Sequence, residues 1–167
     1  MKTMKYKQRN MPTREALERI SREHGLPHVV AEVESALSLI NVANRYREEV
    51  YGKLEKDTGL SEGKFIMLMA LMDNPDGLLM GELARRVGVA DATASMMVKR
   101  MLAQYPALVA VESTSGDKRE RKVHLTESCK SLINRTLPYH HQQIIDFMKP
   151  LSDADKTQLV EILRKLL

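Results

Sequence analysis

The spacing of apolar residues along the chain predicts a mainly helical protein. Apolar side chains recur every three or four positions through most of the sequence, which is the repeat of one face of a helix. Capping residues at segment starts and Gly or Pro at segment ends divide this pattern into separate helices. The first three expected helices cover residues 13–24, 29–56 and 61–73, and two more lie on either side of Gly88. Another is expected to start at Thr126 and to be interrupted or kinked by Pro138, and the last starts at Ser152.

The segment after the helix pair has the pattern of a charged β-hairpin. Residues 108–112 and 121–125 are expected to form two strands, joined by a polar loop. Two tightly connected helices followed by such a hairpin have the layout of a winged helix-turn-helix, in which one helix enters the major groove of DNA. The predicted fold is therefore mainly α: a winged helix-turn-helix with a small β-hairpin wing and dimerisation helices at both ends of the chain.

The helices outside the winged helix predict a homodimer. One face of the 29–56 helix and one face of the helix after Ser152 are strongly apolar, and a single small winged helix cannot cover both. A second copy of the chain would cover them. The expected organisation is a basic arm with a short helix at 1–28, dimerisation helices at 29–57 and 126–167, and a DNA-binding domain at 58–125.

The second helix of the pair carries candidate DNA contacts. Its apolar residues fall at i, i+3, i+4 and i+7 and predict one buried stripe, formed by Ala94, Met97, Val98 and Met101. The opposite face presents small and hydroxylated side chains, which permit close approach, and two cations that reach phosphates or base edges. The exposed face is expected to hold Ala92, Thr93, Ser95, Met96, Lys99 and Arg100, of which Thr93, Ser95, Lys99 and Arg100 are the predicted DNA contacts. An ordinary amphipathic helix in a helical core has the same pattern.

The wing supplies the second group of candidate DNA contacts. Four cations cluster at its tip and on its descending strand, and an arginine there suits a narrow minor groove, where the negative potential is enhanced. Asp117 would repel phosphate, so its expected role is to hold a neighbouring arginine by a charge-assisted hydrogen bond. The predicted contacts of the wing are Asp117, Lys118, Arg119 and Arg121.

The charge distribution agrees with a phosphate-binding surface at the predicted wing and helix pair. The formal net charge is only +4. Residues 80–124 carry eight Lys or Arg against five Asp or Glu, whereas residues 31–79 carry five against nine. A positive excess on one segment is typical of a nucleic-acid-binding surface. A solvated surface of mixed charge gives the same asymmetry.

Other classes of protein and site have little support in the sequence. No apolar run approaches the ~20 residues that span a bilayer, and the single cysteine, Cys129, excludes an internal disulfide. We therefore expect a cytoplasmic protein without a membrane partner. No Gly-rich phosphate loop, nucleophile elbow or paired-carboxylate site occurs, so we expect neither catalysis nor a cofactor. His140 and His141 point about 100° apart on a helix and make a poor metal site.

Together these motifs resemble the MarR family of transcription regulators. The motifs that carry the resemblance are Glu82-Leu83-Ala84, Gly88-Val89, Thr93 and Ser95 in the helix pair, then Asp117-Lys118-Arg119 and Leu125-Thr126-Glu127 around the wing. The resemblance covers about residues 30–167, and the closing segment is similar to the dimerisation helices of the EmrR (MprA) branch. It implies a homodimeric repressor that binds double-stranded DNA at a pseudo-palindromic operator and leaves it when a small effector binds.

The resemblance also implies a place for that effector. In the family, ligands that are often phenolic or aromatic acids bind between the dimerisation helices and the winged helix. The equivalent cleft lies between the 29–56 helix and the 61–73 helix, and Arg47 there suits a carboxylate or phenolate. The candidate lining residues are Asn44, Arg47, Tyr51, Phe65 and Met69. Plain core packing, or an ion pair of Arg47 across the dimer, explains the same residues.

Three residues keep other interpretations open. Family members usually carry Arg or Lys where this chain has Asp91 and Met96. Asp91 suits the positive end of a helix dipole but faces a phosphate backbone unfavourably. The alternative function is therefore a winged-helix protein-interaction module, or a non-specific DNA binder without sequence readout. Cys129 is either an oxidant sensor, as in some family members, or a packed thiol.

Overall fold

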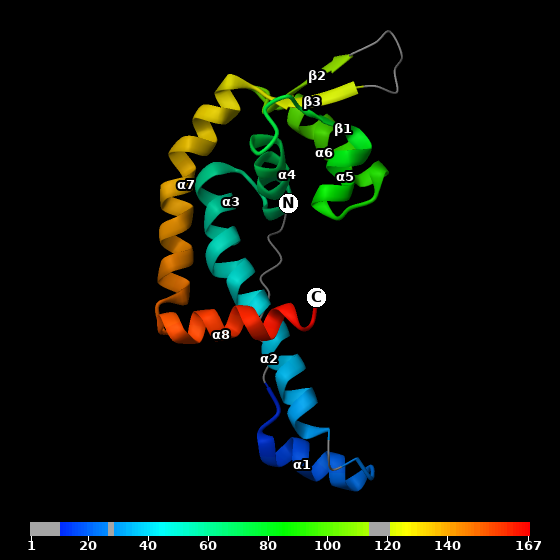
Figure 1. The fold of residues 1–167 in the computed structure, drawn as a ribbon, viewed down its shortest axis with the longest axis vertical. Helices are drawn as coiled ribbons and strands as arrows, with labels where there is room; N and C mark the ends of the chain where they lie inside the picture. Colours follow the sequence, from blue (N-terminus) through cyan, green and yellow to red (C-terminus); the bar gives the residue numbers. More distant parts are fainter. Residues whose placement is uncertain (1–10, 27–28, 114–120) are drawn as a thin grey trace. The chain divides into compact units, whose positions relative to one another are not determined.

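The computed structural model describes residues 11–26, 29–113 and 121–167, and the chain divides into two compact units, one that ends at Lys53 and one that starts at Leu54. The expected fold class is confirmed: the described chain is mainly helical, with a small antiparallel sheet in the second unit (Figure 1). The described elements are α1 (Arg14–Glu23), α2 (Val30–Tyr46), the π-helical segment η1 (Arg47–Tyr51), α3 (Gly52–Thr58), α4 (Glu62–Met72), β1 (Leu78–Leu79), α5 (Met80–Val87), α6 (Asp91–Leu102), β2 (Val109–Ser113), β3 (Arg121–Leu125), α7 (Glu127–Met148) and α8 (Asp153–Arg164). Among these helices, none is long and apolar enough to cross a membrane.

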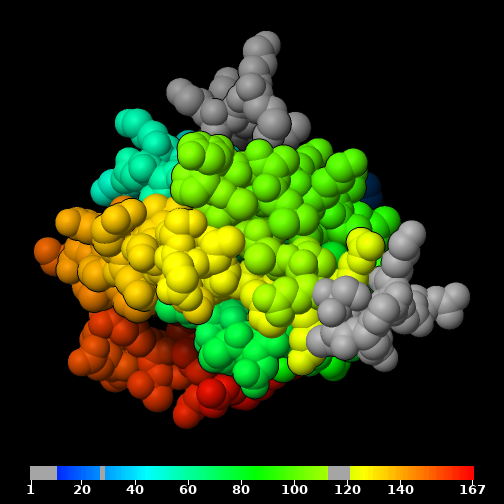
Figure 2. All heavy atoms as spheres, turned by 90° about the horizontal axis from the view of Figure 1, so that it is seen from above, coloured from blue at the N-terminus to red at the C-terminus, as the bar shows by residue number. Residues whose placement is uncertain are grey.

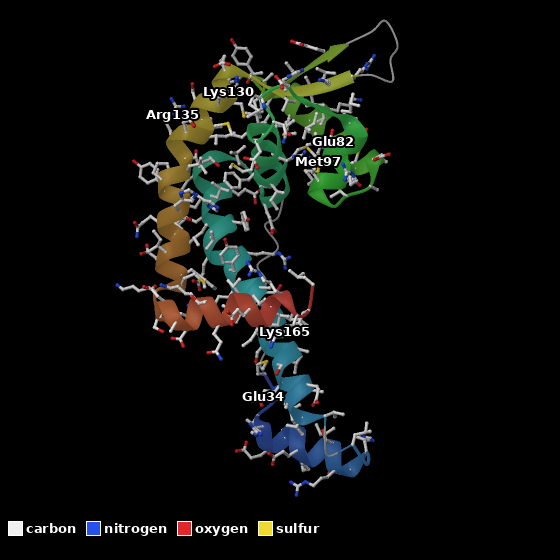
Figure 3. All side chains as sticks on the ribbon, in the orientation of Figure 1. Glu34, Glu82, Met97, Lys130, Arg135 and Lys165 are labelled. Carbon is white, nitrogen blue, oxygen red and sulfur yellow. The ribbon has the colours of Figure 1, made fainter. Side chains whose placement is uncertain are left out.

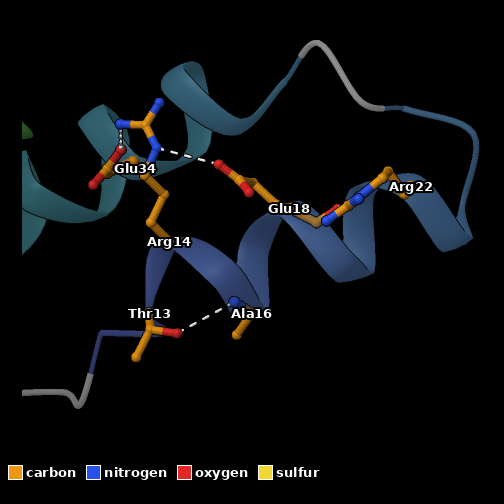
Figure 4. Close-up of polar contacts among 6 residues, drawn as sticks. All are labelled: Thr13, Arg14, Ala16, Glu18, Arg22 and Glu34. Atoms are coloured by element: carbon orange, nitrogen blue, oxygen red, sulfur yellow. Dashed lines mark hydrogen bonds and ion pairs between the residues drawn. The ribbon is translucent and has the colours of Figure 1, made fainter.

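The first unit begins with helix α1, whose start is fixed by a side-chain cap. The Thr13 hydroxyl accepts a hydrogen bond from the Ala16 amide at 3.2 Å, which satisfies one of the N–H groups left over in the first turn. Arg14 then lies between Glu18 on its own helix and Glu34 on α2, at 3.4 and 3.5 Å (Figure 4). Because these ion pairs are exposed to solvent, they orient α1 on α2 more than they stabilise it.

The long helix expected over residues 29–56 is confirmed, and it contains a π-helical turn. The elements α2, η1 and α3 follow one another without a break. At the end of η1 the Gly52 amide donates to the Arg47 carbonyl, five residues earlier. This geometry aligns residues five positions apart, and the rings of Tyr46 and Tyr51 meet edge to face with their centroids 5.6 Å apart. π-Helical turns are frequent at functional sites, and this one contains two of the candidate effector residues.

The winged helix in the second unit has an apolar core of its own. Helix α4 packs on α5 and β3, and α5 packs on α6. Leu68, Leu83 and Met101 are fully buried there. Helix α4 lies close to α6 at Gly63, because a Cβ there would lie 3.2 Å from Cε of Met97, whose side chain points toward α4 (Figure 3). One chain therefore supplies the side chains around which the winged helix folds.

The expected hairpin is confirmed, and a third strand joins it. Strand β2 starts at Val109, one residue later than predicted, and pairs antiparallel with β3, so that Val111 lies opposite Val123. The short strand β1, which the sequence pattern did not predict, pairs with the other edge of β3 and places Leu78 opposite Val123. Leu78 and Val123 are both buried. The central strand therefore anchors the wing in the apolar core.

The turn before β1 depends on a glycine. Gly77 has a φ of 75°, in the left-handed region that residues with a Cβ avoid. The imidazole of His124 on β3 lies against Gly77, so a Cβ there would overlap the ring. His124 also lies beside Glu112 on β2, with 3.6 Å between Nε2 and a carboxylate oxygen. These contacts close the base of the hairpin.

Helix α7 starts as predicted and continues past a proline. The Thr126 hydroxyl accepts from the Cys129 amide and donates to the Ala107 carbonyl at 2.7 Å, so the start of α7 lies beside the segment before β2 (Figure 2). Of the two outcomes expected at Pro138, an interruption or a kink, the interruption is wrong, because α7 is one helix from Glu127 to Met148. Proline removes one N–H donor from a helix. The many other backbone hydrogen bonds of this long helix keep it continuous across Pro138.

Helix α8 has the predicted capping box and differs from the other helices of the second unit in its exposure. The Ser152 hydroxyl accepts from the Asp155 amide at 3.2 Å, and the Asp155 carboxylate accepts from the Ser152 amide at 2.9 Å. None of the described residues of α8 is buried. Its apolar side chains are therefore left without a core in this chain.

Candidate DNA-binding interface

Gly88 makes the tight connection between α5 and α6. It adopts a left-handed conformation, with a φ of 73°, and the Val89 amide donates to the Ala84 carbonyl at 3.1 Å. This is a common way for a helix to end at a glycine. Helix α6 then begins at Asp91. The expected division into two helices at Gly88 is confirmed, and the short connection makes α5 and α6 a helix-turn-helix.

Helix α6 separates a buried stripe from an exposed face. Ala94, Val98 and Met101 are buried, as the spacing predicts, and Met97 is half-buried. At about 100° per residue, these side chains leave the opposite side of the helix to solvent. The exposed face consists of Ala92, Thr93, Ser95, Met96, Lys99 and Arg100. The predicted burial is confirmed for three of the four residues of the stripe, and Met97 is less buried than predicted.

The cations on α6 differ from those on α5 in their partners. On α5, Arg85 and Arg86 both lie near the Glu82 carboxylate, at 3.9 and 3.3 Å, and Figure 3 labels this glutamate on its helix. Lys99 and Arg100 form no ion pair with any other residue that the structure describes. Their charges are therefore not neutralised by a neighbouring carboxylate of the described chain and are available to an anionic partner.

Of the predicted wing contacts, only Arg121 lies among the described residues. Arg121 is exposed at the start of β3, in register with Ser113 of β2. Its neighbour Lys122 is half-buried and lies opposite Glu112. The other predicted wing contacts lie outside the described residues: Asp117, Lys118 and Arg119.

The candidate effector residues come from both units of the chain. In the first unit, Asn44 and Tyr51 are half-buried, and Arg47 is exposed. In the second unit, Met69 is half-buried and Phe65 is buried. Because each unit is described by itself, a cleft that combines these side chains stays a prediction.

Two titratable side chains of α7 are buried in the second unit. Burial raises the pKa of the Cys129 thiol to about 11, which favours the packed-thiol interpretation because oxidant sensing needs a thiolate. His140 lies against Phe65 of α4, with 4.6 Å between ring centroids. Burial, followed by the nearby His141, lowers the pKa of the His140 imidazole. The described residues contain no group of three or more side chains placed to hold a metal ion.

Sequence reasoning missed two local features of this chain. One is the strand β1, which follows the turn at Gly77. Its signal was a glycine before two leucines, and a strand of two residues is too short for an alternating pattern to appear. The other is the π-helical turn η1, because a helix with one inserted residue keeps nearly the same apolar spacing over a short window.

Comparison with known proteins agrees with this geometry. The sequence model of the MarR family matches residues 58–120. The transcriptional repressor YetL of Bacillus subtilis is 35% identical over 109 residues, which make up 65% of this chain and 64% of YetL, slightly less than two thirds. The structure of Sco3205, a MarR family transcriptional regulator of Streptomyces coelicolor in complex with DNA, has a TM-score of 0.69 and 24% identity, and covers 77% of this chain and 84% of that chain.

A second solved structure has the same fold. BpsR of Bordetella bronchiseptica, whose DNA binding is regulated by 6-hydroxynicotinic acid, has a TM-score of 0.69 and 22% identity, over 80% of this chain and 98% of that chain. At such identities the structural likeness supports the fold, and the sequence match supports the family. Residues 58–120 are therefore similar in sequence to the MarR family, and the chain shares the fold of these two solved structures.

Proposed function

We propose that the chain is a transcriptional repressor that binds a pseudo-palindromic operator as a homodimer and leaves it when a small phenolic or anionic aromatic effector binds. The observation that carries this proposal is the exposed face of α6, where Lys99 and Arg100 accompany small and hydroxylated side chains. A helix with such a face fits the major groove, which admits an α-helix. The DNA complex of Sco3205 and the repressor activity of YetL support the same role for this chain.

The homodimer is supported by apolar side chains that remain exposed in the described chain. On α8, Val160 and Ile162 are about half exposed, at 47% and 49%. On α2, Leu39 and Val42 are similarly exposed, at 46% and 55%. Such surfaces mark sites of protein association, and a two-fold dimer sets two recognition helices ~34 Å apart, at successive major grooves. Sedimentation that finds a stable monomer at micromolar concentration overturns this part of the proposal.

The wing is proposed to add a minor-groove contact. We assign that contact to Arg119, with Asp117 orienting it and Lys118 and Arg121 binding phosphates. Arg119→Ala is expected to weaken binding by ~1–3 kcal/mol, while Lys118→Ala mainly flattens the salt dependence. An Arg119→Ala protein that binds the operator like the parent contradicts the assignment.

The effector is proposed to bind beside the π-helical turn, near Arg47 and Tyr51. The π-helical turn that holds both residues supports a functional role for this stretch. The regulation of BpsR by 6-hydroxynicotinic acid, a hydroxylated aromatic acid, supports an effector of this chemistry. A tenfold to hundredfold weaker DNA complex needs ~1.4–2.7 kcal/mol of differential affinity. The closing helices also suggest a place near the EmrR branch of the family.

The experiment that tests the proposal begins with the full chain and a pool of random DNA duplexes. Repeated selection yields the preferred sequence, and titration at several salt concentrations compares it with random duplex. A sequence-specific regulator is expected to prefer the selected site by ~10³-fold or more. Hydroxylated aromatic acids are then titrated against the complex, with Arg47→Ala as the matched variant. Release that Arg47→Ala abolishes supports the effector site, and release by none of these acids contradicts it.

A second candidate function is a winged-helix module or a non-specific DNA binder without sequence readout. The observation that favours it is Asp91, an exposed acid in the first turn of α6, where it faces a phosphate backbone unfavourably. The same selection separates the two functions. A pool that shows no enriched sequence, with equal affinity for all duplexes, supports the second candidate.

A further inference from the structure

The exposed face of α6 is centred on an apolar side chain. Counting about 100° per residue from Ala94, in the middle of the buried stripe, places Met96 about 200° away, nearly opposite the stripe. Met96 is 58% exposed, although it is a large hydrophobic residue. Its neighbour Met97 points toward α4 instead, where it limits the space beside Gly63. Of these two adjacent methionines, therefore, one belongs to the packing between helices and the other faces solvent.

The residues around Met96 leave its end accessible. Ala92 lies one turn before it on the same side of the helix, and Thr93 lies beside that position. Both are short, so neither covers the thioether. Lys99 and Arg100 follow one turn later, and their long side chains have no ion pair among the described residues. An apolar centre bordered by cations suits a surface that places an apolar atom on bases and positive charge on phosphates.

In the major groove, the apolar group that a base pair offers is the 5-methyl group of thymine. A guanine is read by a bidentate Arg or Lys, and an adenine by Asn or Gln; the thioether of Met96 provides none of these hydrogen bonds. Its flexible and polarisable chain is suited to contact with a methyl group. The centre of the α6 face therefore favours a thymine over the other three bases.

We propose that Met96 is a specificity-determining residue that contacts the methyl group of one thymine in each half of the operator. This rests on the proposed function, in which α6 is the recognition helix. The proposal gives Met96, which stands where members of the resembled family usually carry Arg or Lys, a role in sequence readout. Each half-site then contains one thymine whose methyl group contributes to affinity, rather than a guanine read by an arginine.

The test removes the methyl group without changing base pairing. The full chain first selects its preferred duplex from a random pool, and each thymine of that duplex is then replaced singly by deoxyuridine. Removing one methyl group that is buried in the complex is expected to weaken binding about fourfold, from the transfer free energy of one such group. Replacing the symmetry-related pair is expected to weaken binding about fifteenfold. All affinities are measured at one fixed salt concentration.

Variants at the methionine link the methyl group to the side chain. In Met96→Ala and in Met96→Gln, which keeps the length of the side chain, deoxyuridine at the sensitive position is expected to have no further effect. Leu102→Ala is the matched control, because Leu102 is an exposed apolar residue of the same helix, at 40%, away from the centre of the face. This control is expected to keep the full deoxyuridine effect. Circular dichroism verifies that each variant is folded.

The outcomes separate this inference from the proposed function. A selected sequence whose thymines all tolerate deoxyuridine overturns the role of Met96 and leaves sequence-specific binding intact. The same holds if the sensitive thymine responds equally in the parent and in Met96→Ala. A pool without any enriched sequence overturns both proposals together. A deoxyuridine effect that the parent shows and the Met96 variants lose supports the inference.

Discussion

Helices α6 and α8 have the same length but opposite relations to the rest of the chain. Each has 12 residues. Helix α6 buries Ala94, Val98 and Met101 in the winged helix and exposes a largely polar face. Helix α8 buries none of its residues, although it carries apolar ones such as Ile162. The apolar core of the winged helix is thus formed within one chain, and the exposed face of α6 is accessible to a ligand. The closing helix leaves apolar side chains exposed, and the proposed second copy of the chain would cover them.

The largest effect is expected from the core of the winged helix. Leu83 on α5 is fully buried, and Leu83→Ala is expected to lower the free energy of unfolding by ~3 kcal/mol, since it removes buried methyl groups and leaves a cavity. Urea denaturation measures the change. Leu102→Ala, at a 40% exposed position of α6, serves as control and is expected to cost under ~1 kcal/mol. Equal losses in the two variants would mean that the winged helix is not closely packed on its own.

A second test compares two glycines of the winged helix that share a left-handed backbone. Gly77→Ala places a Cβ on the His124 ring, whereas Gly88→Ala meets no atom within 4 Å. We expect Gly88→Ala to cost about 1 kcal/mol from its backbone conformation, and Gly77→Ala to cost about 1–3 kcal/mol more from overpacking. Thermal unfolding of both variants gives the difference. If the two melt at the same temperature, the hairpin base has room to adjust and is less tightly packed than the structure indicates.

Helices α6 and α8 show which features could be predicted from the sequence. The burial of α6 followed from four apolar residues at helical spacing, because a regular helix fixes which side chains share a face. The capping box at Ser152 likewise followed from local hydrogen bonding. These features depend on neighbours in the chain, which a single sequence contains.

What the sequence did not reveal depends on other features. Strand β1 forms by pairing with β3, where Leu78 lies opposite Val123, a residue more than forty positions later in the chain. The π-helical turn and the continuation of α7 past Pro138 depend on small shifts in hydrogen bonding that leave the apolar spacing almost unchanged. The wing contacts and the effector residues were predicted by position. Their roles depend on a partner, DNA or ligand, whose geometry is not encoded in apolar spacing.

The third test concerns the exposed apolar side chains of α8. Ile162→Asp introduces a charge on a face that the homodimer is proposed to bury, and it is expected to weaken association by about 2 kcal/mol, roughly thirtyfold. Sedimentation over a range of concentrations measures the dimer. Glu161→Asp on the same helix is the control, because it keeps a charge that is already exposed there. An unchanged dimer in Ile162→Asp removes α8 from the interface.

The fourth test asks whether the cations of α6 are distinguished from those of α8. Lys99→Ala is expected to weaken DNA binding by about 1 kcal/mol and to reduce the slope of log affinity against log salt by about 0.9, as for one phosphate contact. Lys165→Ala, which removes an equal charge at the end of α8, is expected to leave that slope unchanged. Fluorescence anisotropy at several salt concentrations measures both. Equal slopes in the two variants would indicate that charge acts from the whole chain rather than from the α6 face.

The smallest effect is expected from His140 of α7. This side chain is buried against Phe65, so α7 has a buried face as α6 does, while its other faces are exposed as those of α8 are. Burial lowers the pKa of its imidazole in the folded chain, so the unfolded chain takes up a proton first as the pH falls below the ordinary histidine value of about 6.5. The stability is therefore fully present above that pH and declines as the pH falls toward the lower folded pKa.

His140→Leu keeps an apolar contact with Phe65 and is expected to lose this part of the decline, so that its free energy of unfolding falls less than that of the parent between pH 7 and pH 5.5. His24→Ala, at an exposed position after α1, is the control and is expected to follow the parent. Urea denaturation at the two pH values provides the comparison, and common carboxylate effects cancel in the difference. Parallel curves for the parent and His140→Leu would mean that the folded chain accepts the proton at His140 as readily as the unfolded chain, and that α7 is as open to water as α8.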